Sequence, residues 1–233
     1  MNEIKRIMPL FQQLQITPEE AKEHDARVQK MLEKSEREAK KERYKKSGVP
    51  ERYLAESLDT YTITNDMQRK ASQTAINYLG GIIQGHFRTL VMLGSPGTGK
   101  THLACAVIRE YGGKYRTAPD IVEEIRRAKS FSADRTEKQI IDFYSGCQLL
   151  AIDEIGRGIA ATDEKYMLYQ IINARYNTRK PTVLISNYKK ADFLKYIGVA
   201  AADRLVESAE ILEMDGESYR KSKRQNESTV SAV

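Results

Sequence analysis

The sequence predicts an α/β protein whose parallel sheet is covered by helices on both faces. Short apolar runs of four or five residues alternate along the chain with longer amphipathic stretches. Such short, wholly apolar runs are typical of strands that are buried on both faces. In addition, the glycine-rich residues 94–99 lie directly between an apolar run and a helix-forming stretch, which is the order of a strand–loop–helix unit.

Residues 1–47 are expected to form a helical, highly charged arm ahead of the sheet. Apolar residues recur at helical spacing from Met1 to Leu14, and Thr17-Pro18-Glu19-Glu20 has the chemistry of a helix start. Charges of both signs dominate from there to Lys46. The few apolar residues in this stretch are Val28, Met31 and Leu32. Two interpretations stay open, a solvated or partly disordered helix and a helix that binds a partner protein.

Ser47-Gly48-Val49-Pro50 ends the arm, and residues 48–224 are expected to form the α/β domain. The first helix of this domain is capped by Asn65-Asp66 and is expected to close at Gly80-Gly81. Residues 225–233 are expected to be a disordered tail. The expected strands are residues 89–93, 114–117, 148–152 and 182–186, and the expected helices are residues 66–79, 102–111, 119–129, 134–144 and 163–176.

Composition places the chain among soluble, cytoplasmic proteins. The net charge of +6 over 233 residues is compatible with nucleic-acid binding but does not require it. Cys105 and Cys147 stand in apolar surroundings without metal-ligand spacing, so we expect small core residues in a reducing compartment. The three histidines are scattered, which argues against a transition-metal site. No apolar run approaches the length of about 20 residues that a membrane span needs.

The run Gly94-Ser95-Pro96-Gly97-Thr98-Gly99-Lys100-Thr101 fits the phosphate-binding loop pattern G-x-x-x-x-G-K-[ST]. Glycines let the backbone amides turn toward an anion at a helix N-terminus. Lys100 is expected to contact the β- and γ-phosphates, and the Thr101 hydroxyl is expected to bind Mg²⁺. We therefore predict that this loop, together with His102 directly after it, binds a nucleoside triphosphate.

Two further strand ends carry polar residues suited to triphosphate hydrolysis. Asp153 and Glu154 end an apolar strand about 50 residues after the loop, at the sheet edge where α/β proteins bind ligands. Asp153 is expected to hold Mg²⁺, and Glu154 to polarise the attacking water. Asn187 ends the next strand, where its amide could contact the γ-phosphate and the water. The alternative is that Asn187 only serves the turn into Tyr188.

These motifs occur in an order that resembles a known family. The phosphate loop is followed by Leu149-Leu150-Ala151-Ile152-Asp153-Glu154-Ile155-Gly156, a strand ending in Asn, Ala202-Asp203-Arg204-Leu205 and Ser218-Tyr219-Arg220. This order resembles the AAA+ ATPases of the DnaC/IstB group, and more closely the DnaC-type replicative helicase loaders. The resemblance covers roughly residues 44–220, and it implies a P-loop AAA+ fold with ATP and Mg²⁺ as cofactors.

The resemblance also implies roles for two late arginines. Arg204 matches the arginine finger that reaches the nucleotide of a neighbouring subunit, and Arg220 matches a second sensor that contacts the nucleotide in cis. Arginine suits both roles because its guanidinium is always charged and forks onto phosphate oxygens. The simpler alternatives are an ion pair of Arg204 with Asp203 or Glu207, and a generic basic tail for Arg220.

The implied partners are a hexameric replicative helicase of the DnaB type, single-stranded DNA, and further copies of this chain in an ATP-dependent oligomer. The arm would bind the helicase. The residues expected to contact DNA are Arg126, Arg127, Lys129, Phe131, Lys165 and Tyr166, with cations following the phosphates and rings stacking on bases.

The predicted function is an ATP-dependent helicase loader. The alternative within the group is an IstB-like transposition helper, an ATPase that assembles on duplex DNA and recruits a transposase. A sequence-reading initiator is disfavoured, since the thirteen polar residues after Arg220 leave no room for a helix-turn-helix reader. A small-molecule kinase is disfavoured by the Asp153-Glu154 pair and the two late arginines.

Overall fold

The computed structural model describes residues 18–130, 133–158 and 161–219. They divide into two compact units, Met1–Arg43 and Tyr44–Val233. Helix α2 (Pro18–Lys45) makes up the described part of the first unit. From Lys22 to Arg43 its side chains are exposed apart from a half-buried Lys40, including Met31 at 66%. Between Lys22 and Arg43 this helix buries no side chain, so tertiary packing contributes little to the stability of this part.

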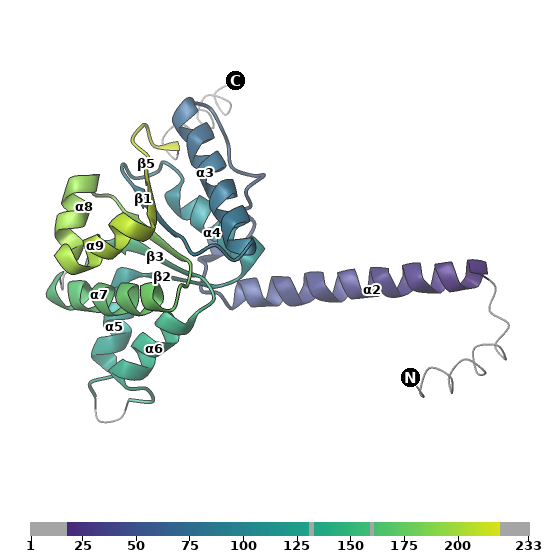
Figure 1. Cartoon of the computed structure of the whole chain (residues 1–233), viewed down its shortest axis with the longest axis horizontal. Helices are drawn as coiled ribbons and strands as arrows, with labels where there is room; N and C mark the ends of the chain where they lie inside the picture. The colour runs from purple at the N-terminus through teal and green to yellow at the C-terminus, as the bar shows by residue number, and fades with distance from the viewer. Residues whose placement is uncertain (1–17, 131–132, 159–160, 220–233) are drawn as a thin grey trace, which may run out of the picture. The chain divides into compact units, whose positions relative to one another are not determined.

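The second unit is a five-stranded parallel sheet in the order β2-β3-β4-β1-β5 (Figure 1). Its strands are β1 (Thr89–Leu93), β2 (Lys114–Thr117), β3 (Leu150–Ile155), β4 (Thr182–Ser186) and β5 (Ala209–Glu213). Its helices are α3 (Asp66–Ile83), α4 (Lys100–Tyr111), α5 (Ala118–Arg127), α6 (Glu137–Gly146), α7 (Ala161–Asn177), α8 (Lys190–Ile197) and α9 (Val199–Ser208), with the short 3-10 helix η1 (Glu51–Tyr53). The predicted α/β fold is confirmed.

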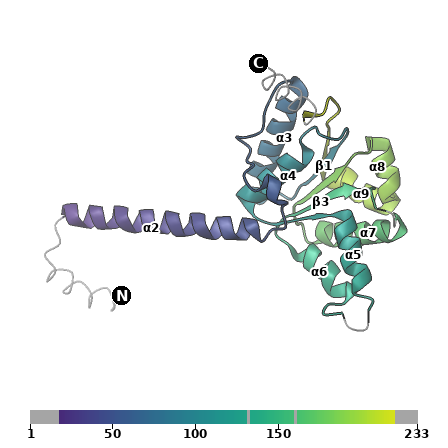
Figure 2. The same cartoon turned by 180° about the vertical axis from the view of Figure 1, so that it is seen from behind.

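Two apolar layers hold the helices against the sheet. Successive residues of a strand point to opposite faces, so Leu90 and Met92 pack with α3 and α4 while Val91 and Leu93 pack with the other helices. Helices α3 and α4 therefore cover one face, and α5 to α9 cover the other (Figure 2). The central strands β1 and β4 are buried at every position, as the sequence predicted for strands covered on both sides.

Helix capping follows the local sequence closely. The Asn65 side chain accepts a hydrogen bond from Gln68 N at the start of α3. At the start of α6, Thr136 and Gln139 exchange side-chain and backbone hydrogen bonds in a capping box. Capping of this kind satisfies backbone N–H groups that would otherwise lack partners in the first turn.

Three expectations about elements were wrong. Helix α3 continues through Gly80 and Gly81 to Ile83, because burying Ile82 (2% exposed) outweighs the cost of about 1 kcal/mol per glycine in a helix. Strand β3 begins two residues later than expected and extends to Ile155. The elements α8, α9 and β5 were not anticipated. Cys105 is buried as expected, whereas Cys147 is only half-buried at the end of α6.

The segment that enters the second unit is bound to the edge of the sheet. Tyr44 is buried and donates a hydrogen bond from its hydroxyl to Tyr53 O. Tyr115 N of β2 donates to Ser47 O. These contacts fix the start of this segment beside β2. Within the described ranges, no helix combines the length and apolar character needed to cross a bilayer.

Candidate functional site

The loop between β1 and α4 exposes backbone amides at a helix N-terminus. Gly94, Gly97 and Gly99 have φ values of 116°, 84° and 98°, which only glycine adopts without strain. Gly99 is the N-cap of α4, and no side chain caps this helix end. The free N–H groups of the first turn and the helix dipole together favour an anion at this position.

Lys100 lies under this loop with only 5% of its surface exposed. Its ammonium donates hydrogen bonds to Gly94 O at 2.8 Å and to Ser95 O at 2.7 Å. Burial of an ammonium is costly unless its charge is compensated. The loop carbonyls stabilise the ammonium, and the open cavity beside it leaves room for an anion to do the same.

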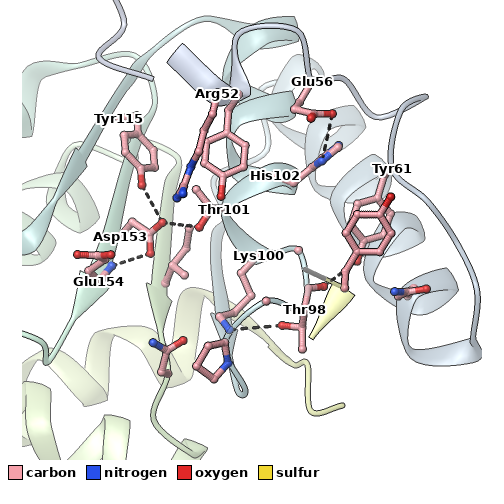
Figure 3. A pocket seen from close by; sticks show the side chains of 18 of the residues that line it. Arg52, Glu56, Tyr61, Thr98, Lys100, Thr101, His102, Tyr115, Asp153 and Glu154 are labelled. Atoms are coloured by element: carbon pink, nitrogen blue, oxygen red, sulfur yellow. Dashed lines mark hydrogen bonds and ion pairs between the residues drawn. The ribbon is translucent and has the colours of Figure 1, made fainter. Parts of the chain in front are cut away.

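Three donors converge on the carboxylate of Asp153 at the end of β3. The hydroxyls of Thr101 and Tyr115 donate to Asp153 Oδ2 at 2.7 and 2.8 Å, and Glu154 N donates to Oδ1 at 2.6 Å. Burial, together with the neighbouring carboxylate, raises the pKa of Tyr115, so Tyr115 remains a donor at all ordinary pH values. Asp153 is thereby held against Thr101 from the adjacent element (Figure 3).

The donor set around Asp153 suits a magnesium ion. A hydroxyl and a carboxylate oxygen lie next to each other beside the phosphate loop. In the described part of the chain, no group of three or more His, Cys, Asp or Glu side chains gathers as a metal cage. Magnesium rarely uses such a cage, since it keeps several waters and takes ligands from substrate phosphates.

Glu154 has a strained backbone. Its φ of 56° lies in the left-handed region that side-chain-bearing residues seldom adopt, and the pairing of β3 with β4 is irregular between Ile152 and Ile155. Irregular strand ends of this kind re-aim side chains next to functional sites. The Glu154 carboxylate is about half exposed and lies 3.5 Å from the Arg157 guanidinium.

These groups line one cavity of about 460 Å³. The sequence-predicted residues in its wall are Pro96, Gly97, Thr98, Gly99, Lys100, Thr101, His102, Asp153, Glu154 and Asn187. The cavity thus brings the phosphate loop together with the ends of β3 and β4, three segments that are far apart in the sequence (Figure 3).

Several wall residues were not anticipated from the sequence. They are Arg52, Tyr53, Glu56, Thr60, Tyr61, Thr62, Gln68, Tyr115, Arg157, Ile185 and Tyr219. Most belong to the segment between η1 and the start of α3, which wraps the phosphate loop. Tyr61 donates its hydroxyl hydrogen to Thr98 O at 3.1 Å, and burial raises the pKa of Tyr61 to about 12. The only signal in the sequence was that the family resemblance begins near residue 44, ahead of this segment.

His102 joins this segment to α4. Its Nε2 lies 2.8 Å from Ser57 O, and its Nδ1 lies 3.4 Å from the Glu56 carboxylate. The ring also packs edge-on against Tyr61 at 5.2 Å between centroids. His102 therefore lines the cavity while both of its nitrogens face the segment (Figure 3).

Arg204 lies on α9 and is not among the residues that line the cavity. It donates to Asn173 Oδ1 at 2.6 Å and to Ala200 O at 2.8 Å, and it faces two tyrosine rings. The hydrogen bonds of Arg204 thus go to residues other than the expected alternatives, Asp203 and Glu207. Arg220 lies outside the described residues.

The candidate DNA contacts fall on two neighbouring helix ends. Arg126, near the end of α5, pairs with Asp163 in the first turn of α7 at 3.0 Å, and Arg127 pairs with Glu123. The ammonium of Lys165 lies over the Tyr196 ring, and Tyr166 is 52% exposed. The exposed Lys129 follows α5. Phe131 lies outside the described residues.

Comparisons with known proteins agree with this geometry. The model of the IstB-like ATP binding protein family matches residues 6–227. The replicative helicase loader DnaC of Escherichia coli K12 is 30% identical over 190 residues, covering 79% of this chain and 77% of the relative. The insertion sequence IS5376 putative ATP-binding protein of Geobacillus stearothermophilus is 34% identical over 141 residues, covering 56% and 55%. A crystal structure of the DnaC helicase loader superposes with a TM-score of 0.62 at 24% identity, covering 71% of this chain and 99% of that one, which shows a shared fold.

Proposed function

We propose that this chain is an ATPase that loads a hexameric replicative helicase onto single-stranded DNA. The chain belongs to the IstB-like family of ATP-binding proteins. It is similar to DnaC helicase loaders over most of its length. The observation that carries the ATPase proposal is the single cavity in which the phosphate loop, Asp153 and Glu154 meet. The identity of the loaded protein rests on the similarity to the DnaC proteins.

In this proposal the loop amides of residues 94–101 bind the β- and γ-phosphates. Lys100 would exchange its loop carbonyl partners for phosphate oxygens, which it can do because Lys100 itself lines the cavity. Thr101 and Asp153 would hold Mg²⁺, Asp153 directly or through water. When bound, the magnesium ion would neutralise charge on the phosphate oxygens.

Two residues at the ends of β3 and β4, Glu154 and Asn187, would carry out the hydrolysis. Glu154 would accept a proton from a water molecule while the oxygen of that water attacks the γ-phosphorus. The bond between the γ-phosphorus and the oxygen that bridges the β- and γ-phosphates would then break. ADP would leave with the bonding electron pair, and the proton would pass from Glu154 to solvent. Asn187, at the end of β4, would orient the water and the γ-phosphate without adding charge.

Two arginines would complete the charge compensation. Arg204 lies outside its own cavity, which supports a role at the nucleotide of a neighbouring copy in an ATP-dependent oligomer. Arg220 would contact the nucleotide in cis. An arginine supplied by a neighbour makes hydrolysis depend on assembly, because the transition-state charge is compensated only in the oligomer.

The proposed contacts with single-stranded DNA and with the helicase lie on the surface of the chain. Single-stranded DNA would bind where the end of α5 meets the start of α7, along Arg126, Arg127, Lys129, Lys165 and Tyr166. Phe131, which lies outside the described residues, is a further expected contact. The helicase would bind the arm, with the exposed apolar residues of α2 as contacts. ATP binding would favour assembly on DNA, and hydrolysis would release the loader.

A second candidate function is favoured by the similarity to the putative ATP-binding protein of an insertion sequence. A transposition helper would use the same nucleotide site but would assemble on duplex DNA and recruit a transposase. The matched region is shorter, at 56% of this chain against 79% for the Escherichia coli loader. We therefore keep the helicase loader as the main proposal.

Glu154→Gln tests the ATPase proposal. The amide keeps the size of the side chain but cannot accept the proton, so we expect ATP to bind with unchanged affinity and hydrolysis to fall by about 10²–10⁴-fold. Glu137→Gln, in the first turn of α6 and outside the cavity wall, is the matched control. Normal hydrolysis by Glu154→Gln would reject the proposed chemistry.

Capture of the host's replicative helicase tests the loader proposal. Deleting residues 1–43 removes the first unit and leaves Tyr44 and Ser47 in place on the second unit. We expect the full chain to hold the helicase and the truncated chain to lose it while retaining ATP hydrolysis. Assembly on duplex DNA with no helicase complex in any nucleotide state would favour the transposition helper instead.

A further inference from the structure

The turn that follows Glu154 is held by hydrogen bonds to both the N–H and the carbonyl of one residue, Gly156. Gly156 has a φ of 85°. Its N–H donates to Glu164 Oε1 at 2.6 Å, and its carbonyl accepts from the Tyr188 hydroxyl at 3.2 Å. Gly156 is two residues from Glu154, whose own φ of 56° is strained. Such a backbone conformation persists only where its surroundings hold it.

Glu164 is an unusual residue to find at this position. It comes from the first turn of α7 and is completely buried. Among the residues that the structure describes, its second oxygen, Oε2, has no hydrogen-bond partner of good geometry, although the Tyr196 side chain interacts with the same carboxylate. Burying a carboxylate with one unsatisfied oxygen lowers stability. The residue is therefore poorly explained by stability alone.

The close packing around Glu164 restricts its position. A Cβ at Gly158 would lie 2.5 Å from Glu164 Oε2, so only glycine fits there without a shift. The Tyr196 side chain packs on the same carboxylate. Burial, and next the nearby Glu164 carboxylate, raise the pKa of the Tyr196 hydroxyl. The Tyr188 and Tyr196 rings lie 5.4 Å apart between centroids. The carboxylate thus has little freedom to leave the Gly156 N–H.

The same turn is bound from β4, next to Asn187. Ser186 donates its hydroxyl hydrogen to Ile155 O at 2.7 Å, and Tyr188 N donates to Ser186 Oγ at 3.2 Å. Ser186 and Tyr188, on either side of Asn187, therefore bind Ile155 and Gly156, the two residues that follow Glu154. Glu164 holds the opposite side of this turn.

We infer that Glu164 is a positioning residue for ATP hydrolysis, which fixes the Gly156 peptide and so keeps the Glu154 carboxylate aimed at the attacking water. This inference rests on the proposed function, because it acts through Glu154. It assigns to α7 a direct part in the geometry of the nucleotide site, although Glu164 is not among the residues that line the cavity.

The test compares Glu164→Ala with Glu164→Gln, with hydrolysis measured in the presence and absence of single-stranded DNA. Alanine removes the acceptor of the Gly156 N–H, so we expect kcat to fall by about 10- to 100-fold while the affinity for a fluorescent ATP analogue stays within about threefold of the wild type. Glutamine keeps a carbonyl oxygen for the same N–H and is expected to restore kcat to within about threefold of the wild type. Glu137→Ala and Glu137→Gln are the matched controls.

A double variant separates positioning from a general loss of stability. If Glu164 acts through Glu154, then Glu154→Gln/Glu164→Ala should hydrolyse ATP no more slowly than Glu154→Gln alone. Should Glu164→Ala fail to fold, Tyr188→Phe removes the hydrogen bond to the Gly156 carbonyl and is expected to lower kcat by about 3- to 10-fold. If Glu164→Ala and Tyr188→Phe both keep the wild-type kcat while Glu154→Gln is inactive, the inference is overturned and the proposed function stays intact. Normal hydrolysis by Glu154→Gln would instead remove the proposed function itself.

Discussion

Two cations are buried among the described residues of the second unit, and they lie at opposite edges of the sheet in different environments. Lys100 follows β1 at the carboxyl edge, is 5% exposed, and donates to carbonyls of its own loop beside an open cavity. Arg175 lies near the end of α7 at the amino edge and is 1% exposed. It donates to Thr182 Oγ1 and to four backbone carbonyls, those of Tyr144, Ser145, Cys147 and Pro181.

The difference separates a cation that we propose binds a ligand from a cation that stabilises the fold. The acceptors of Arg175 come from the end of α6, including its C-cap Cys147, and from the start of β4, so the guanidinium ties both elements to α7. Arg175 is not among the residues that line the nucleotide cavity. Burial lowers the pKa of Arg175 to about 10, which still leaves it charged at neutral pH. The acceptors of Lys100 can be replaced by phosphate oxygens or water without unfolding anything.

The largest effect is expected from Arg175→Met. Removing this guanidinium leaves several buried carbonyls without donors, so we expect the free energy of unfolding to fall by about 3–5 kcal/mol. Urea unfolding followed by circular dichroism measures this loss. Arg69→Met, on the exposed face of α3, should change stability by less than about 0.5 kcal/mol. A similarly small change for Arg175→Met would show that Arg175 does not stabilise the fold, and so does not differ from Lys100 as described.

A loss of activity rather than stability is expected from Lys100→Met. Without the ammonium, charge on the γ-phosphate is uncompensated, so ATP hydrolysis should fall by about 10²–10³-fold. The free energy of unfolding should change by less than about 1 kcal/mol, because water in the cavity can satisfy the loop carbonyls. Steady-state hydrolysis and urea unfolding of the same preparation check both statements. A loss of stability equal to that of Arg175→Met would contradict the assignment of Lys100 to a ligand.

The smallest effect is expected from Thr182→Val, which removes a single acceptor of Arg175. The Arg175 Nε–H group, 2.8 Å from Thr182 Oγ1, would lose its partner at a cost of about 1–2 kcal/mol in the free energy of unfolding. Thr182→Ser keeps the hydroxyl and is expected to retain more of the stability. A larger loss in Thr182→Ser than in Thr182→Val would show that the methyl group of Thr182, and not its hydroxyl, matters at this edge.

The sequence was sufficient where function depends on contiguous residues. The phosphate loop and the Asp153-Glu154 strand end could be predicted because their chemistry is written in short local patterns, and the structure brings them to one cavity. Asn187 was found by the same argument, since parallel strands end at the same edge of a sheet.

Residues whose environment depends on tertiary contacts could not be predicted. Glu164 and Arg175 stand among polar positions of a helical pattern, and such residues are usually exposed. Their burial arises from the turn after β3 and from the starts of two strands, which the periodicity of α7 does not reveal. Tyr61 reaches the phosphate loop from 37 positions away along the chain, and no pattern in the sequence predicted that contact.

Strand β5 has a consequence for how this protein remains dispersed at high concentration. It is the last strand of the sheet on the β1 side, and it carries Glu210 and Glu213 beside its half-buried residues. Glu210 also lies 3.9 Å from Arg88. An edge strand offers free backbone groups to any passing β-strand, and charged side chains discourage that addition. Replacing these two glutamates by valine would leave the nucleotide site untouched and make the chain prone to aggregate through its own edge.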